Sequence, residues 1–258
     1  MVKIHGRLPK KNHKKALRIV KGLAVLAFWL CVWWLAAAAV DREFLLPAPA
    51  AVAGRFLALV STADFWLVTG ASLLRIVAGF LLGMLAGVAL AALVAKSKLA
   101  YALCAPFIKA VRATPVASFI ILALIWIAGA RLPIFIAFLM VLPVAWANTL
   151  AGIEHTDRQL LEMAAVFKVK KSRIRRQIYW PSLRPYVVAA ATTGLGLAWK
   201  SGITAEVIAQ PKLAIGSEVQ AGKVYLETAD VFVWTAVVIA LSLLLERLLL
   251  LLVKRGSS

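Results

Sequence analysis

Long runs without a charged residue limit the fold of this chain more than any other feature. Residues 22–40 contain 19 residues without Asp, Glu, Lys or Arg, close to the ~20 that a helix needs to cross a ~30 Å hydrocarbon core. Further strongly apolar segments follow at about residues 72–95, 113–130, 132–153, 186–209 and 231–253. Lipid leaves no partner for free backbone groups, so each segment should be helical. The sequence predicts an all-α integral membrane protein with six transmembrane helices.

The overall composition agrees with a membrane protein. Hydrophobic residues make up 63% of the chain and charged residues 16%, whereas a soluble domain has roughly 25% charged residues. The net charge of +19 could indicate nucleic-acid binding, but no soluble basic domain remains once the apolar segments are removed. Cys31 and Cys104 lie in or beside apolar runs, so they indicate neither a disulfide framework nor a metal site.

The distribution of Lys and Arg predicts the orientation in the membrane. Residues 1–21 hold eight cations and no acid, and residues 154–185 hold another eight. The alternate loops are poor in cations, and basic loops are typically cytoplasmic. We therefore expect both termini in the cytoplasm, with residues 1–21 as a basic tail and residues 22–258 as one transmembrane domain.

A cleaved signal peptide is the alternative interpretation of the first apolar run. Residues 36–39 are four alanines that could mimic a small-residue cleavage site. The run also contains Trp29, Trp33 and Trp34, which make it bulkier than a usual signal core, and further spans follow. We interpret the run as the first membrane helix.

The basic segment at residues 154–181 is expected to form two short helices outside the bilayer. Thr156 or Asp157 can cap a helix that reaches about Phe167. A second helix could begin at Ser172 as its N-cap and should break at Pro181. On charge alone, this loop could simply bind anionic lipid headgroups.

The spacing within this loop indicates something more specific. Glu162, Ala164 and Ala165 precede Pro181, which stands nineteen positions after the glutamate, and this pattern resembles the EAA motif of permease subunits of binding-protein-dependent ABC importers. The segments "LLPAPAAV", "SLLRIVAGFLLGMLAGV", "NTLAGI" and "GLAWKSGITAEVIA" are similar to the nitrate/sulfonate/taurine branch of that family, over about residues 45–255. This chain departs from the motif at Met163 (in place of Ala), Lys168 (in place of Gly) and Lys170 (in place of a small capping residue).

The resemblance implies a type I ABC importer permease-like (MetI-like) bundle in the bacterial plasma membrane. It implies that the loop docks on a cytoplasmic ATPase through Glu162, Ala164, Ala165, Phe167, Lys168 and Pro181. The expected partners are two ATPase subunits, an extracytoplasmic substrate-binding protein and a second permease, most simply another copy of this chain. The implied function is ATP-driven import, by alternating access, of a small solute such as a sulfonate, nitrate, bicarbonate or a vitamin precursor.

Two ionisable residues within the fifth apolar segment are candidates for the substrate pathway. Lys200 and Glu206 each cost at least ~2.5 kcal/mol at the centre of a bilayer, so they should face the bundle interior or a water-filled path. Six residues correspond to about 600° of helix, which places the two side chains about 120° apart. They are therefore poorly placed to pair with each other. Arg75 is the better partner for Glu206, in a structural pair, and Lys200 is the stronger pathway candidate.

Small residues recur every four positions in two of the apolar segments. Gly79, Gly83 and Gly87 form one row, and Gly194, Ala198 and Gly202 form another. Such rows allow close helix–helix packing, and the second row could pack within the chain or across a dimer.

No feature of the sequence indicates catalysis by this chain. The nearest match to a phosphate-binding loop, residues 194–201, has Trp199 where the second glycine is required and no preceding strand. His155 is a lone histidine that we interpret as a surface residue. We expect no cofactor in this chain, with ATP and Mg²⁺ bound by the partner ATPase. The rival interpretations are a secondary transporter and a membrane-anchored protein that binds lipid or another protein.

Overall fold

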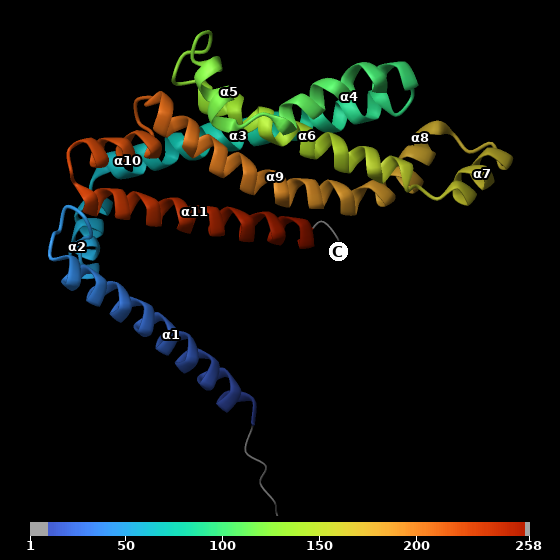
Figure 1. Ribbon diagram of the computed structural model, residues 1–258. Helices are drawn as coiled ribbons and strands as arrows, with labels where there is room; N and C mark the ends of the chain where they lie inside the picture. The colour runs from blue at the N-terminus through green and yellow to red at the C-terminus, as the bar shows by residue number, and fades with distance from the viewer. Residues whose placement is uncertain (1–9, 256–258) are drawn as a thin grey trace, which may run out of the picture.

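Every regular element that the structure describes is helical. The structure is a computed structural model that describes residues 10–255, with side chains from residue 20 onward. Figure 1 shows the arrangement of the helices. In chain order these are α1 (Lys10–Val40), α2 (Pro49–Val60), α3 (Ala63–Val94), α4 (Lys98–Ala113), α5 (Val116–Ala123), α6 (Leu132–Glu154), α7 (Arg158–Val166), α8 (Lys171–Ile174), the π-helical turn η1 (Arg175–Tyr179), α9 (Trp180–Ala209), α10 (Ile215–Val224) and α11 (Thr228–Arg255).

Four helices in the described part of the chain are long and apolar enough to cross a membrane. They are α1 over Val20–Val40, α3, α6 and α11, and the bent pair α4–α5 would make a fifth. The predicted fifth segment lies in α9, which has 30 residues but carries Arg184, Lys200 and Glu206 within its length. The all-helical membrane architecture is confirmed, whereas the count of six spans stays a prediction.

The predicted third span is not one helix. The charge-free run at residues 113–130 contains α5, whose eight residues extend only ~12 Å. Thr114, which precedes Pro115, has an extended backbone with ψ 132°. Proline disfavours the helical conformation of the residue before it, so the helix ends here. The chain bends by 103° between α4 and α5 at this point. The charge-free run therefore forms a broken or re-entrant segment together with α4 and is not a transmembrane helix by itself.

The core of the bundle is a layer of three long helices in which α6 packs between α3 and α9. Gly79, Gly83 and Gly87 of α3 face α6, where an added Cβ at Gly83 would lie 2.8 Å from the carbonyl oxygen of Phe138. In α9, a Cβ at Gly194 would lie 3.3 Å from Val141 of α6, and one at Gly202 only 2.6 Å from Ile76 of α3. Both small-residue rows therefore serve packing within the chain.

The two C-terminal long helices run antiparallel and are held in register by side-chain contacts. The buried indole of Trp199 donates from Nε1 to the carbonyl oxygen of Val238 at 3.0 Å. Nearer the start of α9, Arg184 donates from Nη2 to the carbonyl oxygen of Val253 at 3.4 Å. These two contacts fix which residues of α9 lie opposite those of α11.

Helix α1 diverges from the bundle (Figure 1) and contacts it at its C-terminal end. Trp33 donates from Nε1 to the carbonyl oxygen of Pro47 at 3.1 Å and stacks on Phe232 with ring centroids 5.6 Å apart. From residue 20 to 36 its side chains are almost all exposed. Residues 10–21 belong to the same helix as the apolar run, while residues 1–9 of the predicted basic tail lie outside the described residues.

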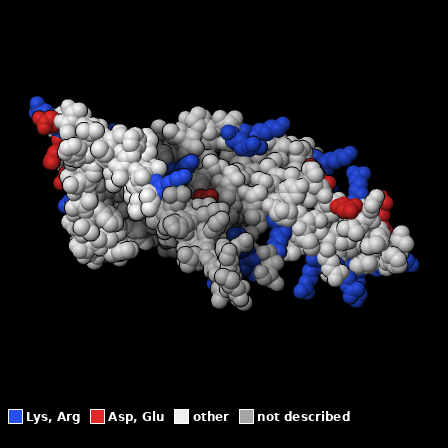
Figure 2. Space-filling view, turned by 90° about the horizontal axis from the view of Figure 1, so that it is seen from below, with Lys and Arg blue, Asp and Glu red and all other residues white. Residues whose placement is uncertain are grey.

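Charged side chains gather at the two ends of the bundle. Figure 2 shows acidic and basic residues at the end that holds α7 and α8 and at the opposite end near α2, with several basic patches on the otherwise uncharged surface between them. The C-terminal ends of α3, α6 and α11 point toward the α7 end of the molecule in Figure 1. The basic loops after α3 and α6 therefore share one end of the molecule with the C-terminus of α11.

Candidate functional site

The first helix of the basic loop starts at a side-chain cap. Asp157 is the N-cap of α7, and its Oδ1 accepts a hydrogen bond from the backbone N–H of Gln159 at 2.8 Å. Thr156, the alternative cap, instead donates from Oγ1 to the carbonyl oxygen of Gly152 at 3.1 Å. The predicted start of this helix is confirmed, with Asp157 as the cap.

The same helix ends in a Schellman turn at the position where the motif has glycine. Lys168 has φ 51°, in the left-handed region. Its N–H donates to the carbonyl oxygen of Ala165 at 3.0 Å, and the N–H of Val169 donates to that of Ala164 at 2.9 Å. These are the two bonds of the Schellman motif, whose C′ position is usually Gly. The lysine therefore adopts the glycine geometry and the turn is retained, although a Cβ makes that conformation less favourable.

Helix α7 exposes large apolar side chains to solvent outside the bundle. Val166 is 77% exposed and Phe167 75%, with Met163 about half exposed. Glu162 and Ala165 are also exposed. Ala164, by contrast, is 2% exposed and belongs to the packing of this chain itself. The surface that a partner could contact is therefore formed by the apolar side chains of Met163, Val166 and Phe167, which we call the α7 apolar face, with Glu162 beside them.

The second half of the loop differs from the prediction. Helix α8 begins at Lys171 rather than at a Ser172 cap, and Pro181 does not end the helix. The chain passes from α8 through η1 into α9, and the N–H of Trp180 reaches the carbonyl oxygen of Arg175 in the wider π-type bond. Proline is tolerated in the first turn of a helix, and the widened turn restarts the bonding pattern just before it. A continuous helical path thus joins the loop to α9.

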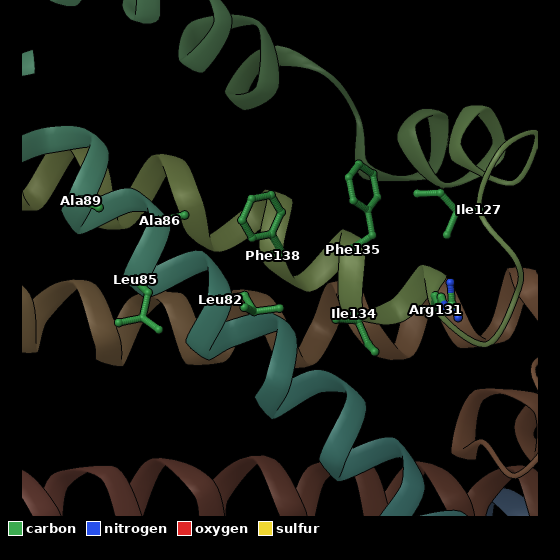
Figure 3. A pocket seen from close by; sticks show the side chains of 9 residues that line it. All are labelled: Leu82, Leu85, Ala86, Ala89, Ile127, Arg131, Ile134, Phe135 and Phe138. Carbon is green, nitrogen blue, oxygen red and sulfur yellow. The ribbon is translucent and has the colours of Figure 1, made fainter. Parts of the chain in front are cut away.

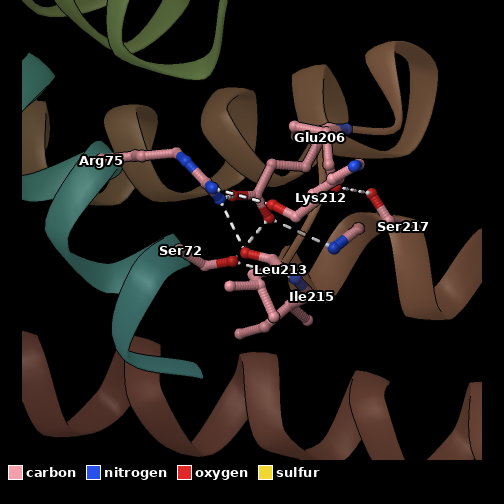
Figure 4. A network of polar contacts seen from close by, with 9 residues as sticks. Ser72, Arg75, Glu206, Lys212, Leu213, Ile215 and Ser217 are labelled. Carbon is pink, nitrogen blue, oxygen red and sulfur yellow. Dashed lines mark hydrogen bonds and ion pairs between the residues drawn. The ribbon is translucent and has the colours of Figure 1, made fainter. Parts of the chain in front are cut away.

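A buried polar network lies at the other end of α9 (Figure 4). Glu206 is fully buried. Its Oε2 accepts from Ser72 Oγ at 2.8 Å and from the N–H of Gly216 at 3.2 Å, and its Oε1 lies 3.4 Å from Arg75 Nη1. The expected Arg75–Glu206 pair is present. A carboxylate so enclosed is a structural group and does not face any described pocket.

This network supplies the cap that α10 lacks in its own sequence. Ala214, the N-cap residue, offers no side-chain acceptor. The first two N–H groups of α10 instead bond to Ser72 Oγ, 2.9 Å from the nitrogen of Ile215, and to Glu206, as described above. Arg75 holds the preceding loop by donating to the carbonyl oxygens of Lys212 at 2.9 Å and Leu213 at 2.8 Å. Side chains from α3 and α9 therefore fix the loop between α9 and α10.

Lys200 lies on the exposed face of α9, away from α6. It lines a pocket of about 320 Å³ between α9 and α11, whose walls also include Thr192, Thr193, Gly196, Trp199, Ser242 and Glu246. Glu246 is a pocket-lining residue that the sequence interpretation did not single out. An acid within the apolar segment at residues 231–253 was the available signal, because ionisable residues in membrane segments are usually functional.

A larger groove on the opposite side of α6 has a different character. It has a volume of about 780 Å³ and lies between α3, α6 and the segment before α6. Figure 3 shows its apolar lining, with Leu82, Leu85, Phe135 and Phe138 among the side chains, and Arg131 at one edge. With a single polar side chain in its lining, it offers little to hold a small polar solute.

The end of the molecule opposite α7 carries an ion pair and a partly buried carboxyl group. Arg55 of α2 donates from Nη2 to Oδ2 of Asp230 of α11 at 2.7 Å. Near this pair, burial, together with the charges of Asp230 and Asp64, raises the pKa of Glu218 in α10 above its ordinary value of 4.5. Among residues 10–255, no group of three or more His, Cys, Asp or Glu residues could hold a metal ion.

The long apolar helices and the loop between α6 and α9 define an integral membrane protein with a protruding helical loop at one end. The sequence matches the family described as binding-protein-dependent transport system inner membrane component over residues 79–257, and the chain belongs to this family. It is a multi-pass protein of the plasma membrane and an ABC transporter permease. Membership implies work alongside an ATPase and a substrate-binding protein.

Individual relatives are named for different solutes. The chain is 29% identical to the riboflavin transport system permease protein of Chloroflexus aurantiacus, with 88% of each chain covered. It is 25% identical to the taurine transport system permease protein of Escherichia coli, over 95% of this chain and 91% of that one. The nitrate import permease protein of Synechocystis is 28% identical over 54% of this chain and 50% of that protein.

Proposed function

We propose that this chain is the permease subunit of an ATP-driven importer and that the α7 apolar face docks on the cytoplasmic ATPase. The observation that carries the proposal is the exposure of Val166 and Phe167, at 77% and 75%, on a capped helix that protrudes from one end of the bundle. Exposed apolar surface of this kind typically marks a protein–protein contact. The continuous helical path from α8 through η1 to α9 provides a mechanical connection from this contact to the membrane.

The assembly that we propose has two copies of this chain, two ATPase subunits that bind ATP and Mg²⁺, and an extracytoplasmic binding protein that delivers the solute. Six spans with both termini in the cytoplasm are part of the proposal, with α4–α5 and α9 as the third and fifth. The clustering of the basic loops at the α7 end supports this orientation, because cytoplasmic loops are enriched in Lys and Arg.

Within the membrane, the proposed pathway follows the exposed face of α9. Thr193, Lys200 and Thr204 are exposed along this face at roughly one- and two-turn spacing. Glu206, the other pathway candidate, is enclosed by the α3–α9–α10 network and has a structural part in the proposal. The solute is small and polar, moved by alternating access.

A loop that docks on an ATPase can be separated from one that binds lipid headgroups by two matched pairs of substitutions. Replacing Val166 and Phe167 by alanine removes apolar contact area but no charge, while replacing Lys170 and Lys171 by glutamine removes charge from the same loop. We expect the first pair to abolish co-purification of the ATPase with the tagged permease and solute uptake by cells. The second pair should retain both.

The opposite pattern, in which only the lysine variants lose function, would indicate a lipid-binding loop and contradict the proposal. Uptake that survives deletion of the ATPase gene would instead indicate a secondary transporter. For each loop variant, thermal unfolding in detergent should show that the permease is folded.

A further inference from the structure

We propose that the pocket between α9 and α11 binds a small zwitterion, with the anionic group of the ligand at Lys200 and its cationic group at Glu246. The inference rests on the proposed function in one respect, since it takes this face of α9 as part of the solute pathway. It adds a second charged residue and a chemical class of ligand.

The two charged residues line one pocket without pairing. Lys200 comes from α9 and Glu246 from α11, and both contribute to the walls of the space of about 320 Å³. Neither side chain forms an ion pair or hydrogen bond with any residue that the structure describes. Each is exposed. An unpaired charge in a membrane segment costs free energy, so two such charges of opposite sign at one pocket call for a compensating ligand.

The position of both residues is fixed by the packing of the helices. The bond from Trp199 to the carbonyl oxygen of Val238, at 3.0 Å, holds the two helices together beside Lys200. The bond from Arg184 to Val253, at 3.4 Å, lies on the other side of Glu246. Rigid elements on both sides of a site keep its charges at a set separation, which favours a ligand whose own charges match it.

Hydroxyl groups complete the polar lining. Thr192 already donates to the carbonyl oxygen of Val188 at 3.0 Å, so its oxygen is available as an acceptor. Thr193 and Ser242 line the pocket and form no hydrogen bond with the described part of the chain. An anion alone would meet Lys200 and these donors, but it would leave Glu246 uncompensated and would be repelled by its charge. A zwitterion satisfies both ends.

Gly196 leaves the space for the ligand. An added Cβ at this position would meet nothing within 4 Å, so a larger side chain can project into the pocket without disturbing helix packing. The volume is at the lower end of the range for ligand sites, which indicates a compact solute of a few heavy atoms.

The test compares two probes on the full-length chain in lipid nanodiscs by isothermal titration calorimetry. Taurine carries a sulfonate and an ammonium group, and isethionate has a hydroxyl in place of the ammonium. We expect taurine to bind at least about tenfold more tightly than isethionate. Glu246→Gln should remove this preference, and Lys200→Met should abolish binding of both probes.

Two further variants keep the test independent of folding. Gly196→Leu should block taurine binding, whereas Gly70→Leu, at a glycine of α3 that likewise has open space around its Cβ position, should leave it unchanged. The double exchange of Lys200→Glu with Glu246→Lys should restore binding of taurine, because a zwitterion can bind in the reversed direction.

Equal affinity for the two probes, no binding of either, or taurine binding that survives Lys200→Met would overturn the proposal. The proposal would also be overturned if each single charge-neutralising variant lowered the thermal stability and the double variant restored it. That result would assign Lys200 and Glu246 to a structural ion pair. None of these outcomes bears on the docking of α7 on the ATPase, because that proposal is tested separately by co-purification.

Discussion

Replacing Glu206 by alanine removes the acceptor at the centre of the α3–α9–α10 network. The change leaves the N–H of Gly216 and the hydroxyl of Ser72 without their carboxylate partner, both in buried positions. A hydrogen bond to a charged group contributes about 1.5–3 kcal/mol, and removing one member of a buried ion pair typically costs about 3–5 kcal/mol. Arg75 keeps its two bonds to backbone carbonyl oxygens, which moderates the loss. We expect the free energy of unfolding to fall by about 3–4 kcal/mol.

Glutamine at the same position provides a graded comparison. Its carbonyl oxygen can take the place of Oε2 and accept from Ser72 and Gly216, while its amide group, a donor like the guanidinium of Arg75, forms no bond in place of the weaker 3.4 Å contact. The expected loss is then only about 1 kcal/mol. Glu162→Ala on the exposed side of α7 is the control, with an expected change below about 0.5 kcal/mol.

The assay is denaturation in mixed micelles, followed by tryptophan fluorescence, combined with hydrogen exchange at the first turn of α10. Glu206→Ala should increase exchange at the amides of Ile215 and Gly216 more than elsewhere, because Glu206 and Ser72 hold those N–H groups. Wild-type stability and wild-type protection of α10 in this variant would refute the assignment of Glu206 as its structural cap.

Three further predictions concern the loop, the helix contacts and pH. Lys168→Gly should stabilise the permease by about 1 kcal/mol in thermal unfolding, because φ 51° is unfavourable for a residue with a Cβ; Lys170→Gly, at φ −58°, should not stabilise it. Gly83→Ala should cost about 1–3 kcal/mol by overpacking against α6, whereas Gly196→Ala, with open space around its Cβ, should be neutral or stabilising in the same assay. The raised pKa of Glu218 means that its contribution to stability is fully present below about pH 4.5 and is lost as the pH rises through the folded-state pKa. Glu218→Gln should therefore flatten the dependence of Tm on pH between 4 and 8, and an unchanged profile would contradict this.

The loop at residues 154–181 illustrates how far local sequence signals reach. The start of α7 at Asp157 could be predicted because an N-cap depends only on a side chain and a backbone N–H two residues away. The passage through Pro181 could not, since one π-type turn at residues 175–179 changes the bonding pattern and leaves no clear mark in composition. The charge-free run at residues 113–130 does not form a transmembrane helix by itself for a related reason. The absence of charged residues predicts that a segment lies in lipid, but it does not predict whether the segment is one straight helix. Here the chain changes direction at Pro115.

The class of protein, the helical secondary structure, the alternation of basic loops and the motif in the α7 loop could all be predicted from the amino-acid sequence. These properties follow from the free-energy cost of placing charges and free backbone groups in lipid. Each residue contributes to that cost separately, so it can be judged from the local sequence. Which polar residues meet, by contrast, depends on the three-dimensional packing of the helices. This packing joined Glu206 to Ser72, buried Ala164, and placed Lys200 and Glu246 at one pocket. Such pairings depend on the rotation and register of one helix against another, which side-chain packing between distant segments sets.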